Sequence, residues 1–401
     1  MTERDGAVET SRISEEALAR LRARIGVEHP IEQPYIRYIN ADSILHMAIG
    51  LGDDNPLWLN RDYAAKTVHG KLVAPPAILY GASWGAWDMR RGEGLPGVHG
   101  LHSADRWTWK RPIVEGDEIR ATRVLTKAEL REGTYGGRSV LQVREFRFYD
   151  AADNLIATCE MSVVRAERSE ARGRGKYADV ELGRYSLEEL DAIDAEIDAE
   201  VPRGATPRLW DDVTKGEKLP AFVRGPLTIG DMLVWHMGAG GAAHVGTGRQ
   251  WLDMRRHGRQ RTIIDPRSNV PQGVQLVHFD TEIARYAAGM PAPYDIGAQR
   301  GAWTTVPFTN WIGDGGFLAS MQIQYRSMNF LFDTTWWHVH VADKWRSPGE
   351  PHGFVECAVE AVNQRGEVTL KGSAICVLPV RGGAPLTFPI EVSPAAADPS
   401  R

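Results

Sequence analysis

The sequence has few cysteines, no long apolar run and no strong excess of either charge. Its three cysteines, Cys159, Cys357 and Cys376, lack Cys-x-x-Cys spacing, and their odd number argues against a disulfide framework. A formal net charge of −5 gives no electrostatic reason to expect nucleic acid or an anionic membrane as a partner. The chain lacks a run of about 18 apolar residues, and its polar N-terminus lacks a signal-peptide core. These features favour a cytoplasmic globular protein with two or more domains.

Two stretches, one near the end of each half of the chain, have the same design. Residues 141–168 and 354–381 each contain two alternating apolar and polar runs around a short polar turn, which predicts an antiparallel hairpin. A cysteine recurs at the matching place in the second strand of each hairpin. Upstream, residues 106–125 and 324–343 each read as a strand, a break that ends at an aspartate, and a second strand. We therefore expect a duplicated chain.

One apolar segment rich in small residues precedes each set of strands, starting at Pro75 in the first half and at Pro293 in the second. Proline suits the first turn of a helix, and glycine lets another backbone approach closely. A long helix wrapped by an antiparallel sheet, occurring twice, places the chain in the α+β class.

A polar stretch separates the two halves and contains its own helix signal. Ser186 and Glu189 form a capping box, and apolar residues at helical spacing follow. The predicted organisation is a first domain at residues 1–166, a linker with a connecting helix at 167–220, and a second domain at 221–401.

The stretch GDDNPLW at residues 52–58 places two carboxylates, an amide and a proline in one turn that leads directly into apolar residues. Asn-Pro and Gly-Asp are typical of turns, so Asp53 could simply cap the turn, and Asn55 is more readily structural than catalytic. The alternative is a loop that holds a carboxylate over a reaction. The residues alone leave both interpretations open.

GDDNPLW, the following LNRDYA and the later GKLVAPPAIL together resemble the MaoC-like, R-specific enoyl-CoA hydratase/dehydratase family. Its signature is a Gly-Asp-x-Asn-Pro loop, a His-x-Asp step and a small-residue segment that enters a central helix. The resemblance spans most of residues 30–165 and 225–380, the latter through VHFDTEIARYAAGMPAPYDIG and TNWIGDGGFL. It implies two tandem hotdog domains that form a pseudo-dimer, no metal, and no cofactor apart from the CoA carried by the substrate.

The resemblance also implies a reaction. In such hydratases one aspartate and one histidine hold a water molecule and act as general base and acid in adding it across a trans-2-enoyl thioester. Water needs its proton removed as it attacks the β-carbon, while the α-carbon gains a proton and the thioester oxygen gains charge. Backbone N–H groups at the start of a helix can hold that oxygen.

This chain divides the signature between its halves. Asp53 and Asn55 match the Asp-x-Asn-Pro part, but Trp58 stands where the family has its histidine. In the second half the His-x-Asp step is present as HFD at residues 278–280, whereas the upstream aspartate position falls at Gly273. The first half therefore keeps the acid without the base, and the second half keeps the base without the acid.

Three arrangements of the active site remain open. His278 could centre a site in the second half, with a polar partner among Asn269, Asp280 and Asp314. Asp53 could centre a site in the first half, with His69 or Tyr63 as a substitute for the missing imidazole. Asp53 and His278 could also meet across the pseudo-dimer interface. The catalytic candidates are Asp53, His278 and Asn55, and the candidate substrate contacts are Trp58, His69, Asp280, Tyr294 and Asp314.

The leading hypothesis is a lyase that hydrates a 2-enoyl-CoA reversibly. A hotdog thioesterase and a non-catalytic acyl-CoA-binding partner subunit are the alternatives. The CoA phosphates would need basic residues at the entrance, with candidates around residues 66–71 and at Arg90, Arg91 and Arg300. Trp58 would line an acyl pocket for a bulky substrate. Two such chains could also associate as a homodimer.

Overall fold

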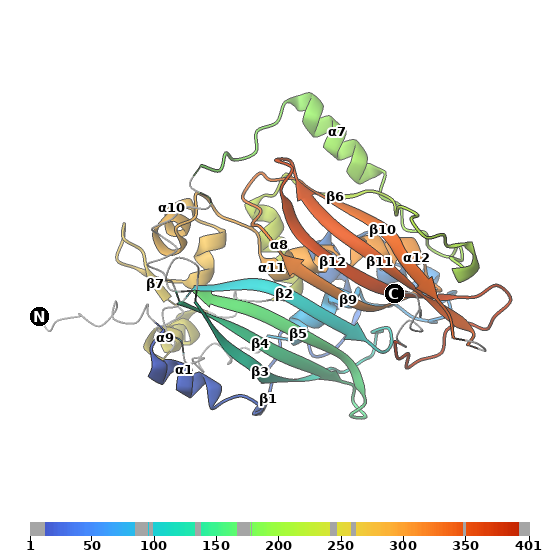
Figure 1. Ribbon diagram of the computed structural model, residues 1–401, viewed down its shortest axis with the longest axis horizontal. Helices are drawn as coiled ribbons and strands as arrows, with labels where there is room; N and C mark the ends of the chain where they lie inside the picture. The colour runs from blue at the N-terminus through green and yellow to red at the C-terminus, as the bar shows by residue number, and fades with distance from the viewer. Residues whose placement is uncertain are drawn as a thin grey trace, which may run out of the picture.

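The computed structural model describes residues 13–84, 95, 99–132, 138–166, 177, 179–240, 247–257, 262–347 and 350–392. Within these residues, one antiparallel sheet of ten strands forms the centre of the molecule (Figure 1). The strand order across it is β1-β3-β4-β5-β2-β9-β12-β11-β10-β6. The strands are β1 (Glu28–Pro30), β2 (His99–Trp109), β3 (Arg120–Glu132), β4 (Arg138–Tyr149), β5 (Leu155–Ala166), β6 (Phe222–Arg224), β9 (Phe317–Tyr325), β10 (Thr335–Trp345), β11 (His352–Asn363) and β12 (Val368–Pro379).

Strands β2 and β9 join the two halves, and their pairing shows a local two-fold axis. Arg106 faces Gln322 at the centre of the pairing, with Ala104 opposite Gln324 on one side and Thr108 opposite Ser320 on the other. A two-fold rotation about the central pair exchanges these two flanking pairs. The strand order outward from this pair is also the same on both sides, β2-β5-β4-β3-β1 and β9-β12-β11-β10-β6, so each half of the sheet repeats the other. The predicted duplication and both predicted hairpins, β4–β5 and β11–β12, are confirmed.

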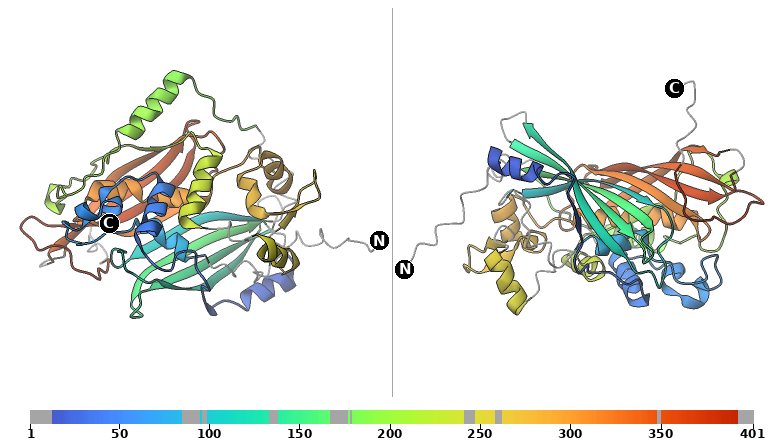
Figure 2. Two further views of the ribbon diagram at one scale, coloured as in Figure 1. Left: turned by 180° about the vertical axis from the view of Figure 1, so that it is seen from behind. Right: turned by 90° about the horizontal axis from the view of Figure 1, so that it is seen from below.

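The helices of both halves gather mainly on one face of the sheet (Figure 2). The largest hydrophobic core lies under them and contains buried residues of both halves, including Trp107 and Trp337. The α-helices are α1 (Glu15–Arg22), α2 (Ala41–Leu51), α3 (Pro56–Leu59), α4 (Arg61–Ala64), α5 (Leu79–Ala82), α7 (Leu187–Asp198), α8 (Ile229–Ala239), α9 (Gly248–His257), α10 (Thr281–Ile283), α11 (Gly297–Trp303) and α12 (Val306–Ile312). None of these described helices is long and apolar enough to cross a lipid bilayer.

The central helix of the second half starts later than the sequence suggests. Proline at 293 predicts a start there, but Tyr294 pairs with Phe330 as an isolated β-bridge, so α11 begins at Gly297. The helix is interrupted at residues 304–305 and continues as α12. In the first half, a 3₁₀ turn at Pro76–Ile78 leads into the short α5. The later part of that expected helix, with Arg90 and Arg91, lies outside the described residues.

Helices α2 and α8 pack against each other and form a pair that the sequence analysis missed. Each begins with reciprocal capping, by Asn40 with Ser43 in α2 and by Thr228 with Asp231 in α8. In each helix a glycine follows at the same distance from the cap, and the two backbones approach there. These close-approach glycines are Gly50 in α2 and Gly238 in α8, where an added Cβ would lie 2.6 Å from the carbonyl oxygen of His46. The sequence contains a signal for this pair: in each helix a reciprocal cap is followed, at the same distance, by a glycine.

The connecting helix is confirmed as α7, whose first turn carries the predicted capping box of Ser186 and Glu189. A smaller two-stranded sheet, β7 (Thr262–Ile264) with β8 (Pro271–Gly273), lies in the second half before a 3₁₀ segment at Val274–His278. Since the large sheet runs without interruption from one half to the other, the domain boundaries at 166 and 221 stay predictions.

Candidate active site

The GDDNP loop of the first half is closed on itself. Gly52 ends α2 in the left-handed conformation (φ 61°) and turns the chain toward Asp53. The Asp53 carboxylate accepts hydrogen bonds from the Trp58 indole (2.9 Å) and from the Asn55 backbone N–H (3.1 Å). Burial raises the pKa of Asp53, and these two bonds oppose the rise. The Asn55 side chain accepts from the Leu57 N–H and so caps α3.

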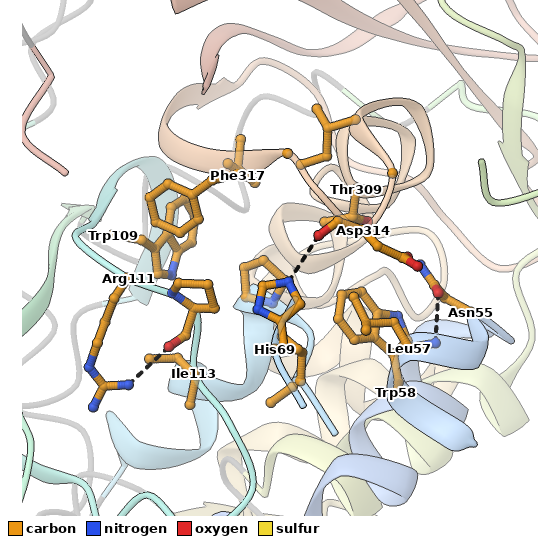
Figure 3. Close-up of a pocket in the computed structure, with 18 residues that line it drawn as sticks. Asn55, Leu57, Trp58, His69, Trp109, Arg111, Ile113, Thr309, Asp314 and Phe317 are labelled. Carbon is orange, nitrogen blue, oxygen red and sulfur yellow. Dashed lines mark hydrogen bonds between the residues drawn. The ribbon is translucent and has the colours of Figure 1, made fainter. Parts of the chain in front are cut away.

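A small cavity of about 50 Å³ lies beside this loop and is mostly apolar (Figure 3). It brings together three of the predicted substrate contacts, Trp58, His69 and Asp314. The Nε2 of His69 donates to the backbone carbonyl of Asp314 (2.9 Å), and the Tyr63 hydroxyl donates to the Asp314 carboxylate (2.6 Å). Burial and this bond raise the pKa of Tyr63 to about 12. Neither His69 nor Tyr63 is hydrogen-bonded to Asp53.

His278 in the second half is held in one orientation. Its Nδ1 bonds to the Tyr294 carbonyl at 2.7 Å, and the two rings meet edge to face with centroids 4.7 Å apart. Because a carbonyl only accepts, Nδ1 carries the proton and Nε2 keeps its lone pair. Burial lowers the pKa of His278 to about 4. The ring is therefore neutral near pH 7 and able to accept a proton at Nε2.

The structure matches His278 to Trp58, its counterpart in the first half. Two residues after Trp58, Asn60 caps α4 through the Tyr63 N–H, and two residues after His278, Asp280 caps α10 in the same way through the Ile283 N–H. The second carboxylate oxygen of Asp280 pairs with Arg267 at 2.8 Å. Asp280 is thus fully engaged in local structure.

None of the three partners suggested for His278 is bonded to it. Asp280 caps α10, and Asp314 lines the cavity beside the GDDNP loop of the first half. Asn269 lies in the β7–β8 turn with a φ of 57°, where its N–H donates to the Asp265 carbonyl. Asp53 and His278 do not form a pair either, because each is held by its own half. The charged groups that influence the pKa of His278 are Asp295 and His236.

Asp295 and Arg300 form a buried ion pair beside this site. Both carboxylate oxygens bind the guanidinium at 2.6 Å, and Arg300 is only 3% exposed. Arg300 also donates to the carbonyls of Ser327 and Thr369. The suggestion that Arg300 binds CoA phosphates at an entrance was therefore wrong, since the side chain is consumed inside the core.

His102, a first-half histidine that the sequence did not single out, lies at the start of α11 in the second half. His102 bonds through Nε2 to Asp105 at 2.6 Å, and Asp105 also accepts from the hydroxyls of Tyr80 (2.7 Å) and Tyr325 (2.8 Å). A Cβ at Gly297, the first residue of α11, would lie 2.8 Å from His102 Nδ1.

Symmetry supports the place of His102. The two-fold axis between β2 and β9 relates His102 to Leu318, which lines the cavity beside the GDDNP loop. Tyr294, whose carbonyl holds His278, comes shortly before Gly297 in the chain. The start of α11 is therefore approached by His278 from its own half and by His102 from the other.

The comparisons with known proteins agree with this architecture. Residues 24–159 match the family model described as "FAS1-like, dehydratase domain region". A UPF0336 protein of Parafrankia sp. is 29% identical over 142 residues, which cover 34% of this chain and 89% of the relative. A UPF0336 protein of Clavibacter michiganensis is 23% identical over 141 residues, covering 34% of this chain and 91% of the relative.

Solved structures match over nearly the whole chain. A MaoC-like dehydratase superposes with a TM-score of 0.61 and 18% identity, covering 90% of this chain and 100% of the other. One from Phytophthora capsici gives a TM-score of 0.52 at 13% identity, covering 91% and 99%. A Mycobacterium tuberculosis protein described as a double hotdog gives 0.52 at 12% identity, covering 88% and 96%. The fold that the resemblance implies is confirmed: the chain has the double-hotdog fold shared with these MaoC-like dehydratases.

Proposed function

We propose that the chain catalyses the reversible hydration of a trans-2-enoyl-CoA to a 3-hydroxyacyl-CoA, at a site in its second half centred on His278. The observation that carries the proposal is the state of this ring. Its Nδ1–H is fixed on the Tyr294 carbonyl, its pKa is lowered to about 4, and it stands at the histidine position of the hydratase signature.

In the hydration direction, Nε2 of His278 accepts a proton from water as the water oxygen bonds to the β-carbon. The electron pair of the double bond moves toward the thioester carbonyl and forms an enolate. The α-carbon then takes this proton from the His278 imidazolium, which returns to its neutral form. A positioned acid–base group of this kind contributes about 10²–10⁴-fold to a rate.

The state of the first half supports this placement. An indole N–H is a donor only, so Trp58 cannot take a proton from water. Its N–H is also engaged by the buried Asp53 carboxylate. The first-half loop therefore has no working base at the signature position.

The test follows the loss of enoyl-thioester ultraviolet absorbance with a panel of trans-2-enoyl-CoAs, from short chains to ring-bearing ones. We expect turnover by the wild-type chain and a loss of about 10²-fold or more in folded His278→Ala. His340→Ala, which removes an exposed histidine from β10, is the matched control and should retain activity.

The other outcomes separate the alternatives. Free CoA thiol released without a 3-hydroxyacyl product would replace the hydratase with a thioesterase. Acyl-CoA binding without turnover on any substrate would favour the non-catalytic partner subunit. Turnover that survives in His278→Ala but disappears in Asp53→Asn would move the chemistry to the first half.

A further inference from the structure

We infer that His236 on α8 is the second catalytic group of the His278 site and binds the attacking water in place of the carboxylate that the loop lacks at Gly273. This inference rests on the proposed hydratase function. It assigns a residue outside the loop signature, on helix α8, where the His236 ring contacts Phe279 next to His278.

The first argument is position. The matched caps and close-approach glycines of α2 and α8 place His236 where Ala48 lies in the first half, each two positions before its glycine. The Ala48 carbonyl accepts the backbone N–H of Asp53 at 3.0 Å. His236 thus occupies the helix position whose first-half counterpart is bonded through its backbone to the residue that carries the loop carboxylate. The imidazole of His236 lies against Phe279, the residue that follows His278.

The second argument is an unsatisfied nitrogen. His236 Nδ1 donates to the Gly240 carbonyl at 2.5 Å, so the lone pair of the neutral ring is on Nε2. The residue is 8% exposed, and Nε2 has no hydrogen-bond partner among the residues that the structure describes. A buried polar atom left unpaired is costly, which calls for a hydrogen-bond donor at this point. A water molecule supplies such a donor.

The third argument is proximity to His278. Both rings contact Phe279, with centroid distances of 5.7 Å for His236 and 6.4 Å for His278. A charge on His236 also lowers the pKa of His278, as expected for neighbouring cations. Both imidazoles have Nδ1 fixed on a backbone carbonyl, and burial lowers the pKa of His236 as well. The site therefore presents two neutral Nε2 acceptors.

Two acceptors can orient one water molecule. The water donates one hydrogen to each Nε2, which directs an oxygen lone pair at the β-carbon. When the C–O bond forms, one of these protons passes to Nε2 of His278 and the electron pair of the double bond forms the enolate. The His278 imidazolium then gives the proton to the α-carbon. An aspartate and a histidine perform the same two tasks in the signature pair. Here the carboxylate is replaced by a second imidazole.

The experiment measures kcat and KM with the best enoyl-CoA of the panel. His236→Gln should lower kcat by about 10²-fold with little change in KM, because water orientation is lost while acyl-CoA binding is kept. The matched control is His46→Ala, which removes an exposed histidine from the paired helix α2 and should keep kcat. Circular dichroism and thermal unfolding of each variant establish that it is folded.

A rescue variant separates catalysis from support of the fold. A Cβ at Gly273 meets no atom within 4 Å, and its φ of −67° suits any L-residue. Gly273→Asp therefore returns the signature carboxylate without steric cost. In the His236→Gln background it should recover at least tenfold in kcat, which a purely structural histidine would not allow.

The outcomes distinguish the inference from the function on which it rests. An unchanged kcat in folded His236→Gln, with activity lost in His278→Ala, overturns the role of His236 and leaves the hydratase standing. Loss of kcat in His236→Gln followed by recovery on adding Gly273→Asp supports the inference. Absence of turnover by the wild-type protein on every enoyl-CoA would overturn the proposed hydratase function itself.

Discussion

The two halves share one scaffold but differ in the segment between the paired helix and the signature position. In the first half, a short loop leads from the end of α2 at Leu51 to Trp58. In the second half, a much longer segment leads from the end of α8 at Ala239 to His278 and includes α9, β7 and β8. The longer segment brings the chain back to the same place, because Asp280 caps its helix as Asn60 does.

The scaffold and the chemistry of the two halves are therefore separable. The short loop fixes its carboxylate on an indole and packs against an apolar cavity. The long segment carries a histidine whose Nε2 lone pair remains available. A duplicated fold needs only one working site, so the other half can exchange reactive groups for packing. The comparison predicts that substitutions in the second half reduce stability and activity more than the matching substitutions in the first half.

The largest expected effect on stability comes from the buried ion pair. Arg300→Met strands the Asp295 carboxylate in the core, and removing one partner of such a pair costs about 3–5 kcal/mol of unfolding free energy. The matching residue of the first half is Tyr80, because Tyr80-Gly81-Ala82 aligns with Arg300-Gly301-Ala302. Tyr80→Phe removes one hydroxyl donor from the Asp105 carboxylate and should cost about 1–3 kcal/mol. Urea denaturation of both variants measures the difference.

A double variant controls for the stranded charge. Asp295→Leu combined with Arg300→Met removes both ions and should recover much of the loss. An Arg300→Met variant that is no less stable than Tyr80→Phe would contradict the expected difference between the two halves, because the two positions would then contribute equally to the unfolding free energy.

A smaller effect follows from the lowered pKa of His278. The unfolded histidine takes up a proton below about pH 6.5, while the folded residue does so only near pH 4. The unfolded state therefore binds more protons in this window, and the unfolding free energy falls as the pH is lowered, by about 2–3 kcal/mol at pH 4.5. His278→Gln should remove this contribution, and Trp58 gives the first half no equivalent.

The measurement is urea denaturation at pH 7.5 and 4.5 for wild type and His278→Gln, so that all other titrating groups cancel in the difference. If the unfolding free energy fell equally in wild type and His278→Gln, the His278 pKa would be the same in the folded and unfolded states. The acid limb of the kcat/KM profile should likewise lie well below pH 6.5, because a base must be unprotonated to act.

Much of the fold could be predicted from the sequence because it depends on local patterns. Alternation over a dozen residues defines each hairpin, and the recurrence of the pattern indicates the duplication. The start of α11 was misplaced because a long-range bridge between Tyr294 and Phe330 overrides the helix signal of Pro293. Tertiary pairing of this kind leaves no mark within the segment itself.

The site was only partly predictable, for two physical reasons. His102 and Asp105 are three apart on a strand, a spacing that normally places side chains on opposite faces. The β-bulge between His102 and Ala104 shifts the register and brings the two together. His236 was missed because it lies far from His278 in the sequence, and only the fold of the intervening segment makes them neighbours.

The smallest expected effect concerns Trp58 and tests whether a substitution in the first half changes stability without changing activity. Trp58→Phe leaves buried Asp53 with only its bond from the Asn55 N–H, which should cost about 1–3 kcal/mol of unfolding free energy. Trp58→His retains an N–H donor and should lose less. Because the proposed chemistry is in the other half, both variants should keep their kcat/KM and their preference among short and ring-bearing enoyl-CoAs. A changed preference would instead support the sequence-based assignment of Trp58 to the acyl pocket, and would mean that the first half, although it lacks a base, still selects the substrate.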